Sequence, residues 1–466
     1  MRVEHDLLGE KSIPDEAYYG VQTARALENF CISGVPISQY PDLIRALAIV
    51  KLAAARANFE CKQFSEEILH GIEGACQEIM DGQLHDQFKV DLIQGGAGTS
   101  TNMAANEVIA NRALEFMGFR KGDYEHCDPH NHVNCAQSTN DAYPTSLHIA
   151  IFLLNNKLVA QLKKLVQAFH HKGDEFREVI KMGRTQLQDA VPMTLGQEFH
   201  AFGESLDNEI TALERIETVL YEVNMGGTAI GTGLNAPAGF GQRCADHLAK
   251  ITGKPVRLAV DLVEATQDTQ PFVLYSSGLK SLAIKLSKIC NDLRLLASGP
   301  RAGLNEINLP QLQPGSSIMP GKVNPVIPEV VNQTSFLVIG LDTTVTLAAS
   351  AGQLQLNVME PVISFALFFS IRTMERAVNS LRENCIVGIT ANADHTRNMV
   401  PNSLGIVTVL KPLLGYKLCA ELAREGYKTG KSLHQIVVEE RKLLTQEKWD
   451  EMFSFERLIN PDLIAE

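Results

Sequence analysis

A glycine-flanked loop at residues 315–325, Gly-Ser-Ser-Ile-Met-Pro-Gly-Lys-Val-Asn-Pro, carries two hydroxyls, one cation and one amide between long helical segments. Glycine adopts backbone conformations that other residues avoid, so this pattern indicates a lid that closes over a ligand and opens again. Backbone N–H groups of residues 316–318 can gather around an anion, while Lys322 adds a positive charge and Asn324 a hydrogen bond. The alternative is an ordinary Ser/Gly/Pro connector, which local composition does not exclude.

The chemistry that suits such a loop is removal of a proton next to a carboxylate. This step gives a dianionic, aci-carboxylate-like intermediate whose extra charge the site must stabilise. A serine hydroxyl titrates far above neutral pH, so Ser316 can act as a base only if N–H groups and Lys322 stabilise its alkoxide in a site closed to water. Ser316 lacks a Gly-x-Ser-x-Gly context and no His-Ser-Asp set is apparent, which argues against a serine hydrolase.

Three further clusters combine hydroxyls and amides at turns between helical patterns, and they can hold carboxylates without charged side chains. Each can equally be a simple helix cap or turn, because Ser, Thr, Asn and Asp favour those positions. The first lacks the Gly-Lys-Ser/Thr ending of a phosphate-binding loop and the strand context of a dinucleotide fingerprint. The candidate residues are Thr99 in residues 94–102, Ser138, Thr139 and Asn140 in residues 137–145, and Thr185 and Gln186 in residues 183–192.

The overall composition bounds the classes of protein that remain. With 466 residues, two or three domains are expected, and 45% hydrophobic with 21% charged residues is typical of a globular protein. The formal net charge of −12 argues against a nucleic-acid surface. The N-terminus lacks a signal-peptide core and no apolar run reaches membrane length, so we expect a cytoplasmic protein. Nine scattered cysteines without a Cys-x-x-Cys pair indicate core thiols rather than disulfides or a zinc site.

Apolar residues recur at spacings of three and four in long segments, which predicts an all-α fold with a central bundle of five long helices. The segment 326–348 is so apolar that we expect it inside a bundle rather than on its surface. Apolar surface this extensive suggests burial between subunits. The predicted domains are an N-terminal domain at 1–140, a helical bundle at 141–395 and a small C-terminal domain at 396–466. The helical patterns cover residues 147–169, 199–223, 279–296, 326–348 and 361–384, with a polar elbow at 183–192.

The loop at 315–325 resembles the signature of the aspartase/fumarase superfamily, and the resemblance extends over the whole chain, from residues 6–10 to residues 402–405. The blocks at 98–100, 138–145 and 183–190 are similar to the branch of this superfamily that eliminates ammonia from aspartate. The resemblance implies a homotetramer whose central domains form a twenty-helix core, with four active sites that each draw residues from three subunits. The proton-abstraction chemistry described above requires no redox cofactor and no catalytic metal, and whether a divalent cation activates the protein cannot be read from the sequence.

By the same resemblance, Ser316 is the catalytic base, and each binding residue takes the role of its matching motif. Two positions depart from the usual family pattern: Ala104 stands where Asn is usual and Cys135 where Lys is usual. Both border predicted binding residues, so they leave affinity less defined than chemistry. The implied binding residues are Lys322, Asn324 and Thr185 for the α-carboxylate, Thr99, Ser138 and Thr139 for the β-carboxylate, Asn140 and Gln186 for the amino group, and Ser317 on the lid.

The expected reaction is the reversible anti elimination of ammonia from L-aspartate to give fumarate. The alternative within the superfamily is fumarate hydratase, which converts L-malate to fumarate and water. Gln186 separates the two, because the hydratase motif would carry a histidine there, able to pair with a carboxylate such as Glu329 and handle water. A non-catalytic lens protein is an alternative of another class, against which the intact Ser316, Lys322 and Asn324 argue.

Overall fold

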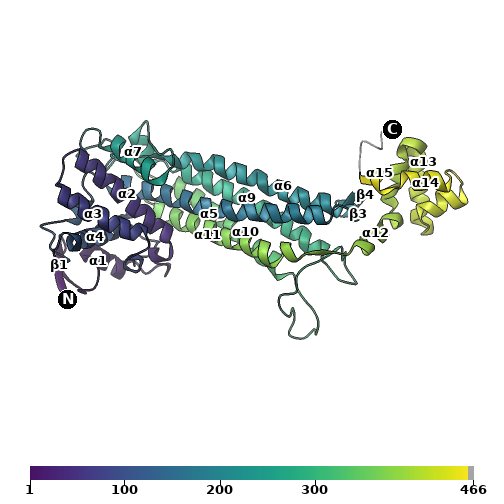
Figure 1. Cartoon of the computed structure of the whole chain (residues 1–466), viewed down its shortest axis with the longest axis horizontal. Coiled ribbons are helices and arrows are strands. Elements are labelled where there is room, and N and C mark those ends of the chain that lie inside the picture. The colour runs from purple at the N-terminus through teal and green to yellow at the C-terminus, as the bar shows by residue number, and fades with distance from the viewer. Residues whose placement is uncertain (460–466) are drawn as a thin grey trace. The chain divides into compact units, whose positions relative to one another are not determined.

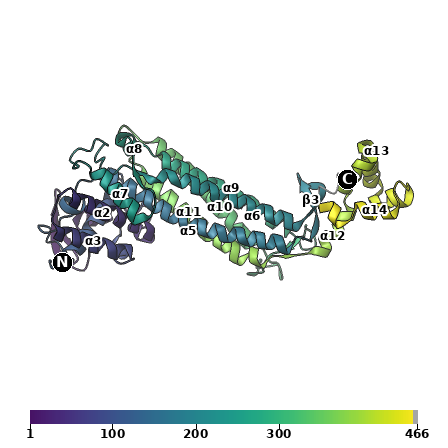
Figure 2. The same cartoon turned by 45° about the horizontal axis from the view of Figure 1, so that its top comes forward.

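Five long helices dominate the computed structural model, which describes residues 1–459 (Figure 1, Figure 2). All five predicted helices are confirmed, and together with the shorter ones they make a mostly helical fold. Each begins or ends beyond the predicted pattern at one end or both, because helix ends carry polar residues that periodicity does not register. The pattern predicted over residues 199–223 was too long at its end, since α6 stops at Glu217 and residues 218–223 form a 3₁₀ turn and a short strand. The five are α5 (Thr139–Glu175), α6 (Leu195–Glu217), α9 (Gln270–Leu296), α10 (Val326–Ser350) and α11 (Glu360–Asn384).

The chain forms two compact units, and every long helix contributes to both. Unit 1 comprises Met1–Ala160, Glu209–Ala283 and Phe336–Glu375, and unit 2 comprises Gln161–Asn208, Ile284–Ser335 and Arg376–Glu466. These units do not test the predicted division into three domains, with boundaries at residues 140 and 395, which stays a prediction.

Unit 1 is built around α2 (Pro41–Glu60), an alanine-rich helix that is buried along nearly its whole length. Its small side chains allow close approach, and it packs against neighbouring helices on several sides. An antiparallel hairpin and a short parallel pair of strands complete the unit. The remaining elements are β1 (Arg2–Asp6), β2 (Gly9–Ile13), α1 (Val21–Asn29), α3 (Glu66–Met80), α4 (Thr99–Phe116), β5 (Glu222–Val223), α7 (Phe240–Thr252), β6 (Arg257–Leu258) and α8 (Leu262–Gln267).

Helix α5 begins at Thr139, five residues before Pro144, although proline normally interrupts a helix after its first turn. The missing N–H of Pro144 leaves the carbonyl of Asn140 without its usual partner. That carbonyl accepts a hydrogen bond from Asn224 Nδ2 at 3.0 Å instead. An amide from another segment thus lets one continuous helix include the candidate residues Thr139 and Asn140.

Unit 2 contains a β-hairpin where a polar elbow was predicted. Strand β3 (Ile180–Thr185) pairs antiparallel with β4 (Gln188–Thr194). The two residues between them, Gln186 and Leu187, have φ of 55° and 61°, which is the two-residue turn whose twist matches a hairpin. The elbow assignment was therefore incomplete, because the turn lacks the Asn-Gly or Asp-Gly signal that would have marked a hairpin.

The C-terminal part of unit 2 has a hydrophobic core of its own, to which β3 contributes Ile180 and Met182. Helices α12 (Ala393–Asn402) and α13 (Val407–Thr429) precede the short α14 (Gln446–Met452) and α15 (Phe455–Ile459). A two-stranded pair, β7 (Ile307–Asn308) with β8 (Thr390–Ala391), ties the segment before the lid to the segment before α12. The short elements predicted after residue 396 are found in part: α14 and α15 are short, whereas α13 spans 23 residues with a non-helical break at Gly415.

Helix α10 is not enclosed by its own chain. In unit 1 its positions 336, 340, 343 and 347 lie on one exposed face, where Phe336 is 60% and Leu347 65% exposed. Its other face is buried and includes Asp342, which accepts from Ser276 Oγ at 2.7 Å and Lys280 Nζ at 2.6 Å. The prediction that residues 326–348 lie inside a bundle is therefore wrong for the single chain, because one chain covers only one side of this helix.

All nine cysteines are free thiols, of which six are buried, Cys61 and Cys135 are half-buried and Cys31 is exposed. No single helix within residues 1–459 is long and apolar enough to cross a bilayer. The stretches Ala393–Met399 and Leu404–Thr429 meet that length and composition only as a pair bent by 63°.

Candidate active site

The candidate residue Thr99 opens helix α4, directly after a tight glycine turn. Gly98 has φ of 90°, and a Cβ added there would lie 2.3 Å from the ring of Tyr143. Only glycine fits, both for its backbone conformation and for its contact with this ring. Thr99 is exposed, and its Oγ1 donates to the carbonyl of Gly96 at 2.8 Å. The hydroxyl is therefore presented to solvent at a helix N-terminus, where backbone N–H groups favour an anion.

The candidate residues at the start of α5 lie against α4. Thr139 Oγ1 accepts a hydrogen bond from Asn102 Nδ2 at 3.2 Å. The Oγ of Ser138 accepts from the backbone N–H of Asn140 at 3.2 Å, and Asn140 Nδ2 donates to the carbonyl of Ala229 at 2.7 Å. The structure thus brings two of the predicted clusters together, and we call residues 94–102 with 137–145 the α4/α5 cluster.

A buried carboxylate holds the backbone of the α4/α5 cluster from beneath. Asp141 has no exposed surface; one of its oxygens accepts from the N–H of Ser138 at 2.9 Å. The other accepts from the N–H groups of Gly226 at 3.1 Å and Thr228 at 3.0 Å. Burial raises the pKa of Asp141 to about 7, against the opposing effect of these N–H donors. Asp141 is a positioning residue that the sequence pattern showed only as a capping residue.

A buried cation lies on the other side of the same loop. Lys51 has no exposed surface, and its Nζ donates to Asn134 Oδ1 at 3.0 Å and to Gln137 Oε1 at 2.9 Å. The same Asn134 oxygen accepts from Asn102 and Asn106, so the cation is linked through amides to the residue that contacts Thr139. Burial lowers the pKa of Lys51 to about 7. Sequence reasoning missed Lys51; its only signal was a lysine within the apolar run of α2.

The two departures from the family pattern lie at this cluster without disturbing its backbone. Ala104 is fully buried on α4. The carbonyl of Cys135 accepts from Asn58 Nδ2 at 2.8 Å and from Gln137 Nε2 at 3.1 Å. The loop at Cys135 is therefore held through its backbone, whatever its side chain.

In unit 2, Thr185 and Gln186 lie exposed at the tip of the β3–β4 hairpin. The base of that hairpin contains a buried ion-pair network centred on Glu306, which has no exposed surface. Lys181 Nζ lies 2.7 Å from one Glu306 oxygen, and Arg184 Nη1 donates to the other. Lys181 also pairs with Glu198 at 2.6 Å. Because a buried pair that loses one partner leaves an uncompensated charge, this network fixes the hairpin to the segment that leads into the lid.

The lid at residues 315–324 has a short framework of its own. The N–H of Gly315 donates to the carbonyl of Lys322 at 2.7 Å, and Asn324 Nδ2 donates to the carbonyl of Gly315 at 2.8 Å. Ser316 Oγ accepts from the backbone N–H groups of Ile318 at 3.2 Å and Met319 at 3.0 Å. Two N–H donors on one hydroxyl oxygen favour its anionic form, as a serine base requires, although the same geometry also caps turns.

The candidate residues thus form three groups: the α4/α5 cluster, the hairpin tip and the lid. Within residues 1–459 no hydrogen bond or ion pair joins the hairpin tip to the lid, and Lys322 is exposed without such a partner. The same residues include no group of three or more His, Cys, Asp or Glu side chains able to hold a metal ion. The roles assigned to the site residues, and the expectation about cofactors, stay predictions.

Comparisons with known proteins identify the family of the chain. The sequence profile of a family described as Lyase matches residues 9–340, and that of the fumarase C C-terminus matches residues 406–460. The chain belongs to this family of lyases. It is 56% identical to an aspartate ammonia-lyase of Pseudomonas aeruginosa, over 99% of this chain and 98% of the relative. It is 53% identical to the aspartate ammonia-lyase of Escherichia coli K12, over 99% of this chain and 96% of the relative.

Two solved structures are similar over nearly the whole chain. A fumarate lyase:delta crystallin from Brucella melitensis, bound to cobalt, superposes with a TM-score of 0.94 at 49% identity, covering 98% of both chains. A class II fumarase from Schistosoma mansoni gives a TM-score of 0.93 at 34% identity, covering 99% of both chains. The predicted family and the mostly helical fold are confirmed.

Proposed function

We propose that the protein is an aspartate ammonia-lyase, which eliminates ammonia from L-aspartate to give fumarate and runs the reverse addition. The observation that carries this proposal is identity of 53% to 56%, over essentially full length, with relatives of that name. The enzyme class is that of a carbon–nitrogen lyase. The site geometry supports the chemistry, because it offers hydroxyls, N–H donors and one exposed cation for a substrate with two carboxylates.

In the proposed mechanism, Ser316 removes a proton from Cβ of L-aspartate. The electron pair of the broken C–H bond moves into the adjacent β-carboxylate, giving the aci-carboxylate, and then returns to form the double bond as the Cα–N bond breaks. The two backbone N–H groups that donate hydrogen bonds to Ser316 Oγ stabilise its alkoxide before it takes the proton from Cβ. Ammonia leaves already protonated, and no step requires a redox cofactor or a catalytic metal.

In this proposal each of the three groups of candidate residues holds a different part of the substrate. Thr99, Ser138 and Thr139 hold the β-carboxylate, where charge develops, through hydroxyls and helix N-termini. Lys322, Asn324 and Thr185 hold the α-carboxylate, with Ser317 adding lid contacts. Asn140 and Gln186 face the amino group. The exposed position of Thr185 and Gln186 at a turn anchored by buried ion pairs suits a binding tip on a rigid base.

We also propose a homotetramer in which three subunits build each site. The exposed apolar face of α10, which includes Phe336 and Leu347, supports an assembly that covers it. The division of the candidate residues into three groups supports sites completed by other subunits. Sedimentation or light scattering of the purified protein tests the tetramer directly.

The experiment that tests the activity measures fumarate by its ultraviolet absorbance, with L-aspartate and then L-malate as substrate. We expect turnover of aspartate and little or none of malate, because Gln186 cannot shuttle a proton as a histidine would. A site built to hydrogen-bond one polar group can reject an analogue by several orders of magnitude. Comparable turnover of both substrates, or of malate alone, would replace the assignment with fumarate hydratase.

A further inference from the structure

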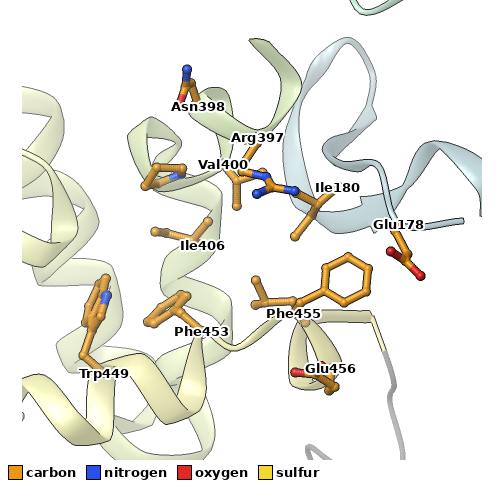
Figure 3. Close-up of a pocket in the computed structure, with 12 residues that line it drawn as sticks. Glu178, Ile180, Arg397, Asn398, Val400, Ile406, Trp449, Phe453, Phe455 and Glu456 are labelled. Atoms are coloured by element: carbon orange, nitrogen blue, oxygen red, sulfur yellow. The ribbon is translucent and has the colours of Figure 1, made fainter. Parts of the chain in front are cut away.

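A pocket of about 620 Å³ lies within unit 2, and none of the candidate active-site residues lines it. One wall is the start of β3 with α12, and the opposite wall is α14 with α15 (Figure 3). Its volume lies in the range that small organic ligands occupy. Most of its lining is apolar. The exposed Pro401 lines it, and the other apolar residues belong to the core of the C-terminal part: Ile180, Val400, Ile406, Trp449, Phe453, Phe455 and Leu458.

The pocket also contains one cation and two acidic groups. Arg397 lies beside Val400 and Ile180 in the close-up, on the side that faces the aromatic rings (Figure 3). Within residues 1–459 its guanidinium makes no hydrogen bond and no ion pair. Glu178 and Glu456 lie at the edges of the pocket, and both are exposed. A guanidinium without a counter-ion can bind a carboxylate through two parallel hydrogen bonds, and the neighbouring aromatic rings can contact an apolar group on the same ligand.

We propose that this pocket binds a small amphipathic carboxylate, with its anionic group on Arg397 and its apolar body against Trp449, Phe453 and Phe455. The edge carboxylates of Glu178 and Glu456 further favour an ammonium on the same molecule. The ligand class is therefore a carboxylate with an aromatic or large aliphatic body, either a simple acid or an amino acid with such a side chain. The dicarboxylate of the proposed reaction does not fit this description, because it has no apolar body.

The position of the pocket connects such a ligand to the β3–β4 hairpin. Ile180, in its wall, is the first residue of β3 and pairs with Thr194 of β4. After α12, Ser403 Oγ donates to Asp189 Oδ2 of the same hairpin at 2.7 Å. A ligand that braces these walls therefore contacts the base of the element whose tip carries Thr185 and Gln186.

Trp449 makes the proposal directly measurable, because it is the only tryptophan in the chain and it lines the pocket. The intact protein is titrated with 3-phenylpropionate, L-phenylalanine and phenethylamine while Trp449 fluorescence is followed. We expect saturable changes with both carboxylates and at least tenfold weaker binding of the amine, which lacks the group that Arg397 binds. Tighter binding of phenylalanine than of phenylpropionate would assign the ligand to amino acids, and the reverse order to simple acids.

The variant Arg397→Gln should weaken carboxylate binding at least tenfold without changing the folded state, because Arg397 is exposed. Arg424→Gln is the matched control, since Arg424 is an exposed arginine on α13 that does not line the pocket. Saturating fumarate should leave the titration unchanged. The proposal is overturned by no response in the wild-type protein, by equal response to acid and amine, by unchanged binding in Arg397→Gln, or by displacement with fumarate.

Discussion

The α4/α5 cluster and the lid are both polar and both assigned to substrate, yet they are supported in opposite ways. Beneath the cluster lie two fully buried ionisable groups, Asp141 and Lys51, each with at least two hydrogen bonds to the loops it holds. The lid is half-exposed or exposed throughout, and its hydrogen bonds stay within residues 315–326.

This difference matches two tasks of an elimination site. The groups that receive developing charge must be in place before the reaction, because reorganising them during the step would raise its barrier. The group that removes the proton must admit substrate and then exclude water, which requires a segment with few ties to its surroundings. Substitutions in the two regions should therefore separate effects on stability from effects on turnover.

The largest effect is expected for Ser316→Ala. Loss of a general base lowers turnover by roughly 100- to 10,000-fold. Substrate binding, circular dichroism and oligomer size should persist, because the lid residue carries little of the core. Ser317→Ala is the neighbouring comparison and should lose much less, since its backbone N–H remains. A Ser316→Ala enzyme that keeps a tenth of wild-type turnover would rule this residue out as the base.

Mixed tetramers test whether the lid and the hairpin that complete one site come from different chains. Inactive Ser316→Ala and Thr185→Val proteins, unfolded together and refolded, should regain up to about a quarter of wild-type activity by random assortment in a closed oligomer. Each variant refolded alone should stay inactive. If demonstrated mixed tetramers recover nothing, Ser316 and Thr185 of one site belong to the same chain.

Asp141→Asn, beneath the α4/α5 cluster, should lower both the stability and the activity of the protein. The substitution places an amide where three backbone N–H groups need acceptors, and an unsatisfied buried network of this kind costs about 2–4 kcal/mol. Lys322→Met, on the exposed lid, should change the free energy of unfolding by less than about 0.5 kcal/mol while still lowering activity. Urea unfolding of both variants measures the contrast; equal destabilisation would remove the distinction between the two regions.

Gly98→Ala and Gly96→Ala form a matched pair within the glycine turn. Both positions have positive φ, 90° and 88°, but an added Cβ meets the Tyr143 ring at 2.3 Å only at Gly98; at Gly96 the nearest atom is 3.9 Å away. Gly98→Ala should displace Thr99 and lower kcat/KM by up to about 100-fold, the cost of a misplacement of about 1 Å. Gly96→Ala should show only the effect of backbone strain. Similar kinetics in the two variants would exclude the contact with Tyr143 as the cause of the lower kcat/KM in Gly98→Ala.

The sequence predicted most of what depends on local pattern. The long helices follow from apolar spacing, and the lid and hydroxyl clusters follow from their motifs. The hairpin at residues 180–194 was missed because Gln186 and Leu187 adopt left-handed backbone without glycine. Lys51 and Asp141 were missed because their roles depend on segments distant in sequence, Asn134 for the one and Gly226 for the other. The exposed face of α10 was misjudged because an apolar helix signals burial without saying which chain provides it.

A pH-dependent effect on stability is expected for Glu360, at the start of α11 in unit 1. This carboxyl is 4% exposed, and burial raises its pKa from 4.5 to about 8. A raised folded-state pKa means that the stabilising contribution is fully present below about pH 4.5 and is lost as pH rises through about 8. Glu360→Gln keeps the shape of the side chain but removes the group that titrates. As the pH rises from 5 to 8, the free energy of unfolding of Glu360→Gln should therefore increase relative to that of the wild type, by at most about 1.4 kcal/mol per pH unit. Urea midpoints of both proteins across this range measure the difference, with Lys322→Met on the exposed lid as a control whose profile parallels the wild type. Parallel profiles for Glu360→Gln as well would show that this carboxyl is not held in its neutral form.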